Sequence, residues 1–208
     1  MTFHAEILTD RQTRVLDAVS AIAHTGGFYL AGGTAVALRF GHRRSEDFDW
    51  FAPELGRPEI LAAELRSAGL ALEQVEMAEG TLNCRIEGVK VSFLKYAYPL
   101  LAPVDEWPDK RIVLASVADL AAMKLLAIAQ RGARKDFVDV HELLRRGSTI
   151  EAMLADFQQK FAADTTTVLR GLVYFDDAEL EPMPEMISAF DWPSAKDLLR
   201  NAVQEVLR

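Results

Sequence analysis

The sequence predicts an α+β protein, with a mixed sheet flanked by helices in its N-terminal half and helices alone in its C-terminal half. Three observations support this fold class. Residues 28–96 alternate short apolar segments with helical ones, and after residue 116 apolar positions recur mainly at helical spacing. Residues 98–108 contain three prolines and are expected to connect the halves. We therefore expect two domains, an α/β domain over residues 1–110 and a helical domain over residues 111–208.

The first elements alternate between helix and strand. Apolar residues at helical spacing predict a helix over Thr9–Ala23, with Thr9 or Asp10 as its N-terminal cap and Gly26–Gly27 at its end. The elements expected next are a strand at Phe28–Ala31, a helix at Thr34–Phe40, a strand at Asp47–Phe51 and a helix at Arg57–Ala68.

Three strand-like segments follow, at Leu70–Met77, Thr81–Glu87 and Val89–Tyr96. Turn residues at Ala78–Gly80 and Gly88 separate them, which predicts an antiparallel meander. One further strand is expected at Arg111–Leu114. The later helices are expected at Ser116–Gln130, Lys135–Arg146, Ile150–Phe161, Thr165–Val173 and Ser194–Leu207, with the acidic, proline-bearing segment Phe175–Pro193 irregular.

Composition narrows the class of protein. Half of the 208 residues are hydrophobic, as in a globular protein with a buried core. The formal net charge of −8 argues against broad nonspecific nucleic-acid binding but leaves room for a local basic cleft. The single cysteine, Cys84, excludes an internal disulfide. With no signal layout and no apolar run near the roughly 20 residues that span a bilayer, we expect no membrane association and a cytoplasmic location.

The most informative stretch is Leu30–Phe51, which reads LAGGTAVALRFGHRRSEDFDWF. Gly32 and Gly33 open a helical run, and backbone N–H groups at such a helix start suit a phosphate. Asp47 and Asp49 lie two residues apart in a predicted strand, so their carboxylates point to the same side. Two such carboxylates together with substrate phosphates suit Mg²⁺. The stretch therefore predicts a site for a nucleoside triphosphate and its metal.

Each part of this pattern is weak evidence on its own. A glycine pair is equally consistent with a tight turn from strand to helix, and Asp-x-Asp pairs also occur on solvated strand edges. Here the two aspartates lie within FDWF, where burial of an unpaired carboxylate is costly without a cation or hydrogen-bond donors. The strand, glycine turn, helix and aspartate strand are specific in combination.

This stretch resembles the first motif of the DNA polymerase β-type nucleotidyltransferase superfamily and, more narrowly, of the AbiEii/AbiGii-type toxin family. The family's R-x-S-x-D-x-D-x-F run is matched by Arg43 or Arg44, Ser45, Asp47, Asp49 and Phe51. Residues 119–144 resemble its later motif, a lysine followed by R-x-x-K-D-x-x-D. That motif is matched by Lys124, Arg131, Lys135, Asp136 and Asp139.

The resemblance implies a nucleotidyltransferase fold and the transfer of a nucleoside monophosphate from an NTP to an acceptor hydroxyl. It implies tRNA as the acceptor, the toxin role in a toxin–antitoxin or phage-defence pair, and a cognate antitoxin as partner. One or two Mg²⁺ ions would bind Asp47 and Asp49. The nucleotide-binding residues would be Gly32, Gly33, Thr34, Ser45, Lys124, Arg131 and Lys135, and the catalytic residues Asp47, Asp49, Lys124 and Asp136.

One position departs from the superfamily pattern. A third carboxylate is usual on a neighbouring strand, and the corresponding residue here is Ser92, which is no general base at neutral pH. Asp136 or Asp139 could act as the base, two metal-bound carboxylates could suffice, or the protein could bind nucleotide without efficient turnover. A small-molecule nucleotidyltransferase of the aminoglycoside-modifying kind and a weakly active nucleotide-binding module therefore remain as alternatives.

Several charged residues also have simpler interpretations. Asp136 would interact favourably with the helix dipole in a first helical turn, Asp139 would pair with a surface cation, and His42 and Arg134 are expected to be solvated.

An RNA acceptor would need a local basic surface. The residues available for that surface are Arg39, Arg43, Arg44, Lys90, Lys95, Arg131, Arg134 and Lys135.

Overall fold

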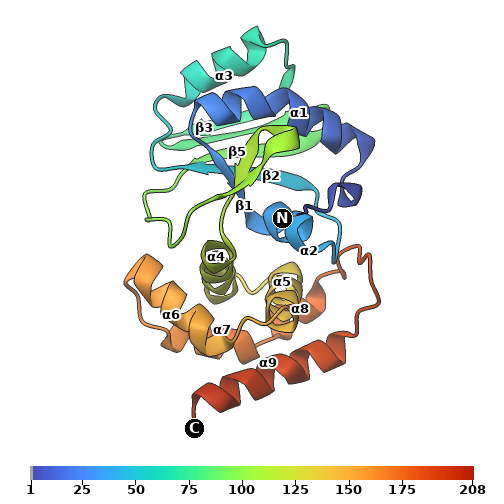
Figure 1. Ribbon diagram of the computed structural model, residues 1–208, viewed down its shortest axis with the longest axis vertical. Coiled ribbons are helices and arrows are strands. Elements are labelled where there is room, and N and C mark those ends of the chain that lie inside the picture. Colours follow the sequence, from blue (N-terminus) through green and yellow to red (C-terminus); the bar gives the residue numbers. More distant parts are fainter. Residues whose placement is uncertain (1) are drawn as a thin grey trace.

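The computed structural model describes residues 2–208 as a twisted sheet with helices on both faces and a group of helices beneath it (Figure 1). The chain therefore has the α+β layout that the sequence predicts. The strands are β1 (Tyr29–Ala31), β2 (Asp47–Ala52), β3 (Leu72–Ala78), β4 (Thr81–Ile86), β5 (Val89–Lys95), β6 (Asp105–Trp107) and β7 (Ile112–Leu114).

The strands form one mixed sheet in the order β3-β4-β5-β2-β1-β7-β6. Strands β3, β4 and β5 pair antiparallel in sequence, which confirms the predicted meander. In the centre, β2 runs parallel to β5 and antiparallel to β1. This pairing places the end of β1, the two aspartates of β2 and the middle of β5 side by side.

Three N-terminal helices cover the sheet, namely α1 (Asp10–Thr25), α2 (Gly32–Phe40) and α3 (Pro58–Ser67). Thr9 and Gln12 form a reciprocal capping box at the start of α1, as the predicted Thr9 cap requires. Helices α1 and α3 lie on one face, and α2 lies on the other, facing the C-terminal helices (Figure 1). The C-terminal helices are α4 (Val117–Gln130), α5 (Arg134–Arg145), α6 (Ile150–Phe161), α7 (Thr166–Val173), α8 (Asp176–Leu180) and α9 (Trp192–Val206).

Apolar side chains gather into two cores that divide near the start of α4. The first contains the sheet residues, with Trp50 and Phe93 fully buried, and ends at Leu120. The second begins at Ala121 and holds the helices together. The expected domain boundary at residue 110 stays a prediction, and β7 lies on its C-terminal side while pairing with β1.

Two short elements were missed by the sequence interpretation. Strand β6 lies in the segment expected to be a connection, where it pairs with β7 at the sheet edge. Helix α8 lies in the segment expected to be irregular. Short 3-10 helices also occur at Ala5–Ile7 and Pro108–Lys110. Among residues 2–208, no helix combines the length and apolar character that crossing a bilayer requires.

Candidate active site

The glycine pair forms the junction between β1 and α2. Gly32 has a positive φ of +68°, a backbone conformation that glycine adopts readily. A Cβ atom at Gly32 would lie 2.6 Å from Asp49 Oδ2, and one at Gly33 would lie 2.6 Å from Arg43 Nη2. Both positions therefore favour a residue without a Cβ atom, because the backbone there packs directly against the side chains of Asp49 and Arg43.

Strand pairing places Asp49 between the glycine turn and β5. Its Cα lies opposite Ala31 of β1 on one side and Ser92 of β5 on the other. The Ser92 side chain, where a third carboxylate was expected, is buried and hydrogen-bonds Asp49. Ser92 therefore supports one of the two acids. Along the same register, Asp47 lies opposite Lys90.

These groups line a cavity of about 320 Å³ between the sheet and the helices, which we call the nucleotide cavity. Its sheet wall holds both aspartates, both glycines, Ser45 and Lys90, and its helical wall comes from α4, α5 and the link between them. The polar members of the helical wall are Lys124, Arg131 and Lys135, and its apolar members are Leu120, Met123 and Ala127.

The sheet wall has the donor set that a hard cation needs. Burial, followed by repulsion from Asp47, raises the pKa of the Asp49 carboxyl above its usual range. A bound cation would relieve this penalty. Among residues 2–208, no group of three or more His, Cys, Asp or Glu side chains is arranged to hold a metal. Two carboxylates that leave the other positions to phosphate and water fit the usual coordination of Mg²⁺.

The helical wall carries cations that already have partners. Lys124 Nζ lies 2.8 Å from Asp136 Oδ1 and 2.7 Å from Asp139 Oδ2, and all three side chains are buried. Burial would lower the pKa of Lys124, but these carboxylates outweigh it and raise that pKa. Arg131 Nε also donates to Asp136, at 2.8 Å. Asp136 thus positions Lys124 and Arg131 at the cavity wall but does not line the cavity itself.

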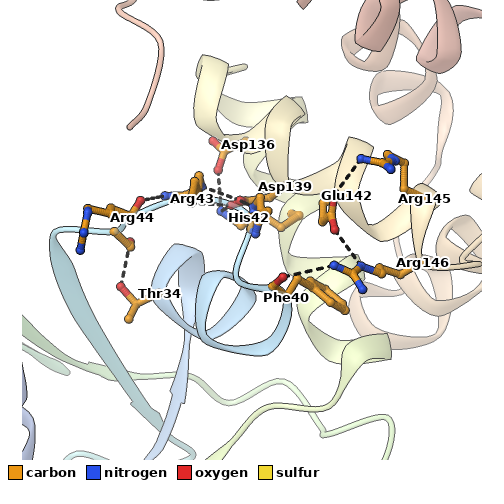
Figure 2. Close-up of polar contacts among 12 residues, drawn as sticks. Thr34, Phe40, His42, Arg43, Arg44, Asp136, Asp139, Glu142, Arg145 and Arg146 are labelled. Atoms are coloured by element: carbon orange, nitrogen blue, oxygen red, sulfur yellow. Dashed lines mark hydrogen bonds and ion pairs between the residues drawn. The ribbon is translucent and has the colours of Figure 1, made fainter. Parts of the chain in front are cut away.

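Asp139 links the helical wall to the turn between α2 and β2 (Figure 2). Arg43 donates to both of its oxygens, at 2.7 and 2.8 Å, and His42 Nε2 contacts Oδ1 at 2.8 Å. Burial would raise the pKa of Asp139, but Arg43 and Lys124 hold it well below its usual range. The simpler interpretation of Asp139, pairing with a surface cation, is therefore wrong, as is the expectation of a solvated His42, which is buried.

The sequence-predicted site residues fall into two groups. Those that line the nucleotide cavity are Gly32, Gly33, Ser45, Asp47, Asp49, Lys124, Arg131 and Lys135. Thr34 does not line it, and its hydroxyl donates to the Asp47 carbonyl oxygen and contacts the Ser45 hydroxyl at 2.8 Å. That Thr34 binds phosphate and that Asp136 is catalytic both remain predictions. In the structure, the side chains of both residues contact other protein groups.

Sequence reasoning also misjudged the surroundings of two cations. Arg134 was expected to be solvated, but its Nε donates to the Ala178 carbonyl oxygen and its guanidinium lies over Trp192. Lys90 was expected only on a general basic surface, yet it lines the nucleotide cavity. The signal that could have placed Lys90 is its position two residues before Ser92, on the same face of β5.

The fold built around this cavity is that of the nucleotidyltransferases. JHP933 from Helicobacter pylori aligns with a TM-score of 0.59 and 18% identity over 99% of this chain and 93% of its own. MenT4, a nucleotidyltransferase toxin from Mycobacterium tuberculosis, aligns with a TM-score of 0.51 and 16% identity, covering 96% of this chain and 86% of its own. At these identities the likeness concerns the fold.

Sequence comparison identifies the family within that class. The family model for the nucleotidyl transferase AbiEii toxin of type IV toxin–antitoxin systems matches residues 14–101 and 99–206. The chain belongs to this AbiEii nucleotidyltransferase family, which confirms the resemblance found in the two motifs. A relative from Aquifex aeolicus, described as an uncharacterized protein, is 34% identical over 203 residues, covering 96% of this chain and 98% of its own length.

Proposed function

We propose that this protein transfers a nucleoside monophosphate from an NTP to a hydroxyl group of an RNA acceptor, with tRNA as the acceptor class. The observation that carries the proposal is the composition of the nucleotide cavity. Two aspartates without an ion-pair partner among residues 2–208 face a glycine turn and four cationic side chains in one enclosed space. Membership of the AbiEii family supports the same reaction.

In this proposal each wall has its own task. Asp47 and Asp49 hold one or two Mg²⁺ ions, which when bound supply positive charge to the phosphate oxygens. The backbone N–H groups of Gly32 and Gly33 bind the β- and γ-phosphates. The helical wall offsets the remaining charge of the triphosphate with Lys124, Arg131 and Lys135.

A second, larger cavity supports a polyanionic acceptor. This acceptor groove, of about 870 Å³, adjoins the nucleotide cavity and shares Ser45, Asp47, Lys90 and Lys135 with it. Phosphate contacts by Arg and Lys dominate RNA affinity, so a basic groove leading to the reacting centre suits an RNA end. Its basic residues are Arg11, Arg43, Arg44, Arg85, Lys90 and Lys135, of which Arg43 and Arg44 are paired with Asp139 and Glu185. Its acidic residues are Glu46, Asp47, Glu181 and Glu185.

The biological role that we propose follows from the family. The protein acts in the cytoplasm, where NTP and tRNA are available, as the toxin of a toxin–antitoxin or phage-defence pair, and a cognate antitoxin counteracts it. A test of this role is growth arrest on expression of the wild-type chain, relieved by co-expression of the neighbouring gene. Growth unaffected by an active, well-expressed enzyme would contradict the toxin role.

The reaction itself is tested by label transfer. Purified protein is incubated with each α-³²P-labelled NTP, Mg²⁺ and total tRNA, alongside Asp49→Asn and the control Asp17→Asn. Asp17 pairs with Lys110 at a half-exposed site on α1, outside the nucleotide cavity. We expect labelled RNA from wild type and the control, and a loss of at least about 100-fold in Asp49→Asn. Transfer that survives Asp49→Asn would overturn the metal assignment.

Ser92 gives specific support to a second candidate, a nucleotide-binding module with little turnover. Its hydroxyl hydrogen-bonds Asp49 where a third acid would otherwise stand. The same assay separates the candidates when equilibrium NTP binding is measured beside it. Binding without transfer to RNA or to an aminoglycoside would favour the module, and transfer to the aminoglycoside alone would favour the small-molecule enzyme.

A further inference from the structure

The nucleotide cavity and the acceptor groove meet at four residues, Ser45, Asp47, Lys90 and Lys135. An NTP in one cavity and an acceptor hydroxyl in the other can react only at this junction. On the basis of the proposed function, we propose that Lys90 is a catalytic residue that contacts the transferred α-phosphoryl group and offsets the negative charge that develops there.

Lys90 differs from the cations of the helical wall in its partners. Lys124 and Arg131 are held by Asp136, and Lys124 also by Asp139. Among residues 2–208, no ion pair involves Lys90 or Lys135, and the charge of Lys90 is near enough to the Asp49 carboxyl to oppose the rise in its pKa. Lys135 lies in the first turn of α5, whereas Lys90 lies on the sheet wall beside the predicted metal ligands.

The register of the sheet fixes where the Lys90 backbone lies. Its Cα is the parallel partner of Asp47, two residues along β5 from the Asp49–Ser92 pair. Lys90 and Ser92 point to the same side of β5, because side chains alternate along a strand. Its side chain is exposed and lines both cavities. The Lys90 side chain thus extends from a strand inside the sheet, beside the two-carboxylate site.

The proposed transfer reaction needs a cation at the position of Lys90. The acceptor oxygen forms a bond to the α-phosphorus while the bond from that phosphorus to its β-bridging oxygen breaks. Pyrophosphate leaves with the bonding electron pair, and the hydroxyl proton passes to solvent. Charge on the transferred group and on the two in-line oxygens is stabilised by positioned cations. Lys90 supplies such a cation from the sheet side.

The test compares Lys90→Met and Lys90→Arg with Arg85→Met in the full chain. Arg85 lines the acceptor groove but not the nucleotide cavity, so it serves as a matched cation. We expect Lys90→Met to lower kcat about 100-fold, with less than a threefold change in the equilibrium Kd for a non-reactive α,β-methylene NTP. Lys90→Arg should recover most of kcat, and Arg85→Met should change only the KM for RNA. Melting temperatures check that the variants remain folded.

Two results would overturn the inference while leaving the proposed function intact. One is wild-type kcat in Lys90→Met. The other is a loss in kcat/KM that the weaker Kd explains in full, which would make Lys90 a binding residue only. Wild-type protein that transfers no NMP to any acceptor would instead overturn the proposed function, and the part of Lys90 in catalysis with it.

Discussion

The two walls of the nucleotide cavity differ in whether their charged side chains have partners of opposite charge within the protein. On the helical wall, Lys124 and Arg131 contact Asp136, and Lys124 also contacts Asp139, so opposite charges balance within the protein. On the sheet wall, no ion pair among residues 2–208 involves Asp47 or Asp49, and the pKa of Asp49 is raised.

This difference indicates that the charges of the helical wall are balanced within the protein, and we propose that those of the sheet wall are balanced by a bound cation. Functional sites commonly retain groups that cost stability in the free protein. Substitutions can test this difference in two ways. One removes a carboxylate that balances the cations of the helical wall, and the other changes the carboxylate pair of the sheet wall or its surroundings.

The largest effect on stability is expected from Asp139→Asn. This change leaves the buried Arg43 and Lys124 with one carboxylate fewer, and breaking a buried pair costs about 3–5 kcal/mol in the free energy of unfolding. Urea unfolding measures the loss. Asp197→Asn is the control, since Asp197 pairs with Arg200 on the exposed face of α9 and should lose less than about 1 kcal/mol.

The same carboxyl predicts a dependence of stability on pH. Because the pKa of Asp139 is lower in the folded chain than in the unfolded chain, its ionised form stabilises the fold. That contribution is present above the unfolded pKa of about 3.9 and is lost as pH falls below it. The difference in unfolding free energy between wild type and Asp139→Asn should therefore shrink as pH falls below about 4. A constant difference would contradict the assignment.

A smaller effect, aimed at the sheet wall, is expected from Gly32→Ala. Gly32 and Gly27 have nearly the same positive φ, +68° and +69°, but a Cβ at Gly27 would contact nothing within 4 Å. Both alanine variants should lose about 1–2 kcal/mol from backbone strain. Only Gly32→Ala should also displace Asp49 and lower NMP transfer at least about tenfold. Equal activity in the two variants would show that the close approach to Asp49 is unimportant.

The smallest effect is expected from Thr34→Val, which keeps the shape of the side chain but removes its hydroxyl. The bonds from Thr34 to Ser45 and to the Asp47 carbonyl oxygen fix α2 against β2. Their loss should cost about 0.5–1.5 kcal/mol in thermal unfolding, with little change in the Kd for NTP. Thr13→Val, at a half-buried position of α1 where the hydroxyl donates to the Thr9 carbonyl oxygen, is the control. A Kd weakened tenfold or more would favour the phosphate contact predicted from the sequence.

The sequence predicted best what depends on neighbouring residues. The turn at Gly32–Gly33 and the strand with Asp47 and Asp49 follow from local periodicity and turn chemistry, and both lie where expected. Strand β6 and helix α8 were missed because each is short and lies in a proline-bearing segment. Tertiary pairing, rather than local preference, decides such elements.

Long-range charge pairing could not be read from the sequence in the same way. Arg43 and Asp139 are 96 residues apart, and nothing local distinguishes a buried partner from a solvated one. The family resemblance predicted that Lys124 and Arg131 would both bind the nucleotide. It did not show that Asp136 holds them both. The difference in charge pairing between the two walls therefore follows from the three-dimensional structure and could not be predicted from the sequence.

The difference in charge balance between the two walls is tested most directly by the melting temperature of Asp49→Asn without nucleotide or metal. In wild type, the raised pKa of Asp49 means that its ionised form destabilises the folded chain above the unfolded pKa of about 3.9. At pH 7 the neutral amide should therefore raise the melting temperature, whereas Asp139→Asn lowers it. A melting temperature that falls in Asp49→Asn as it does in Asp139→Asn would contradict the division between the two walls.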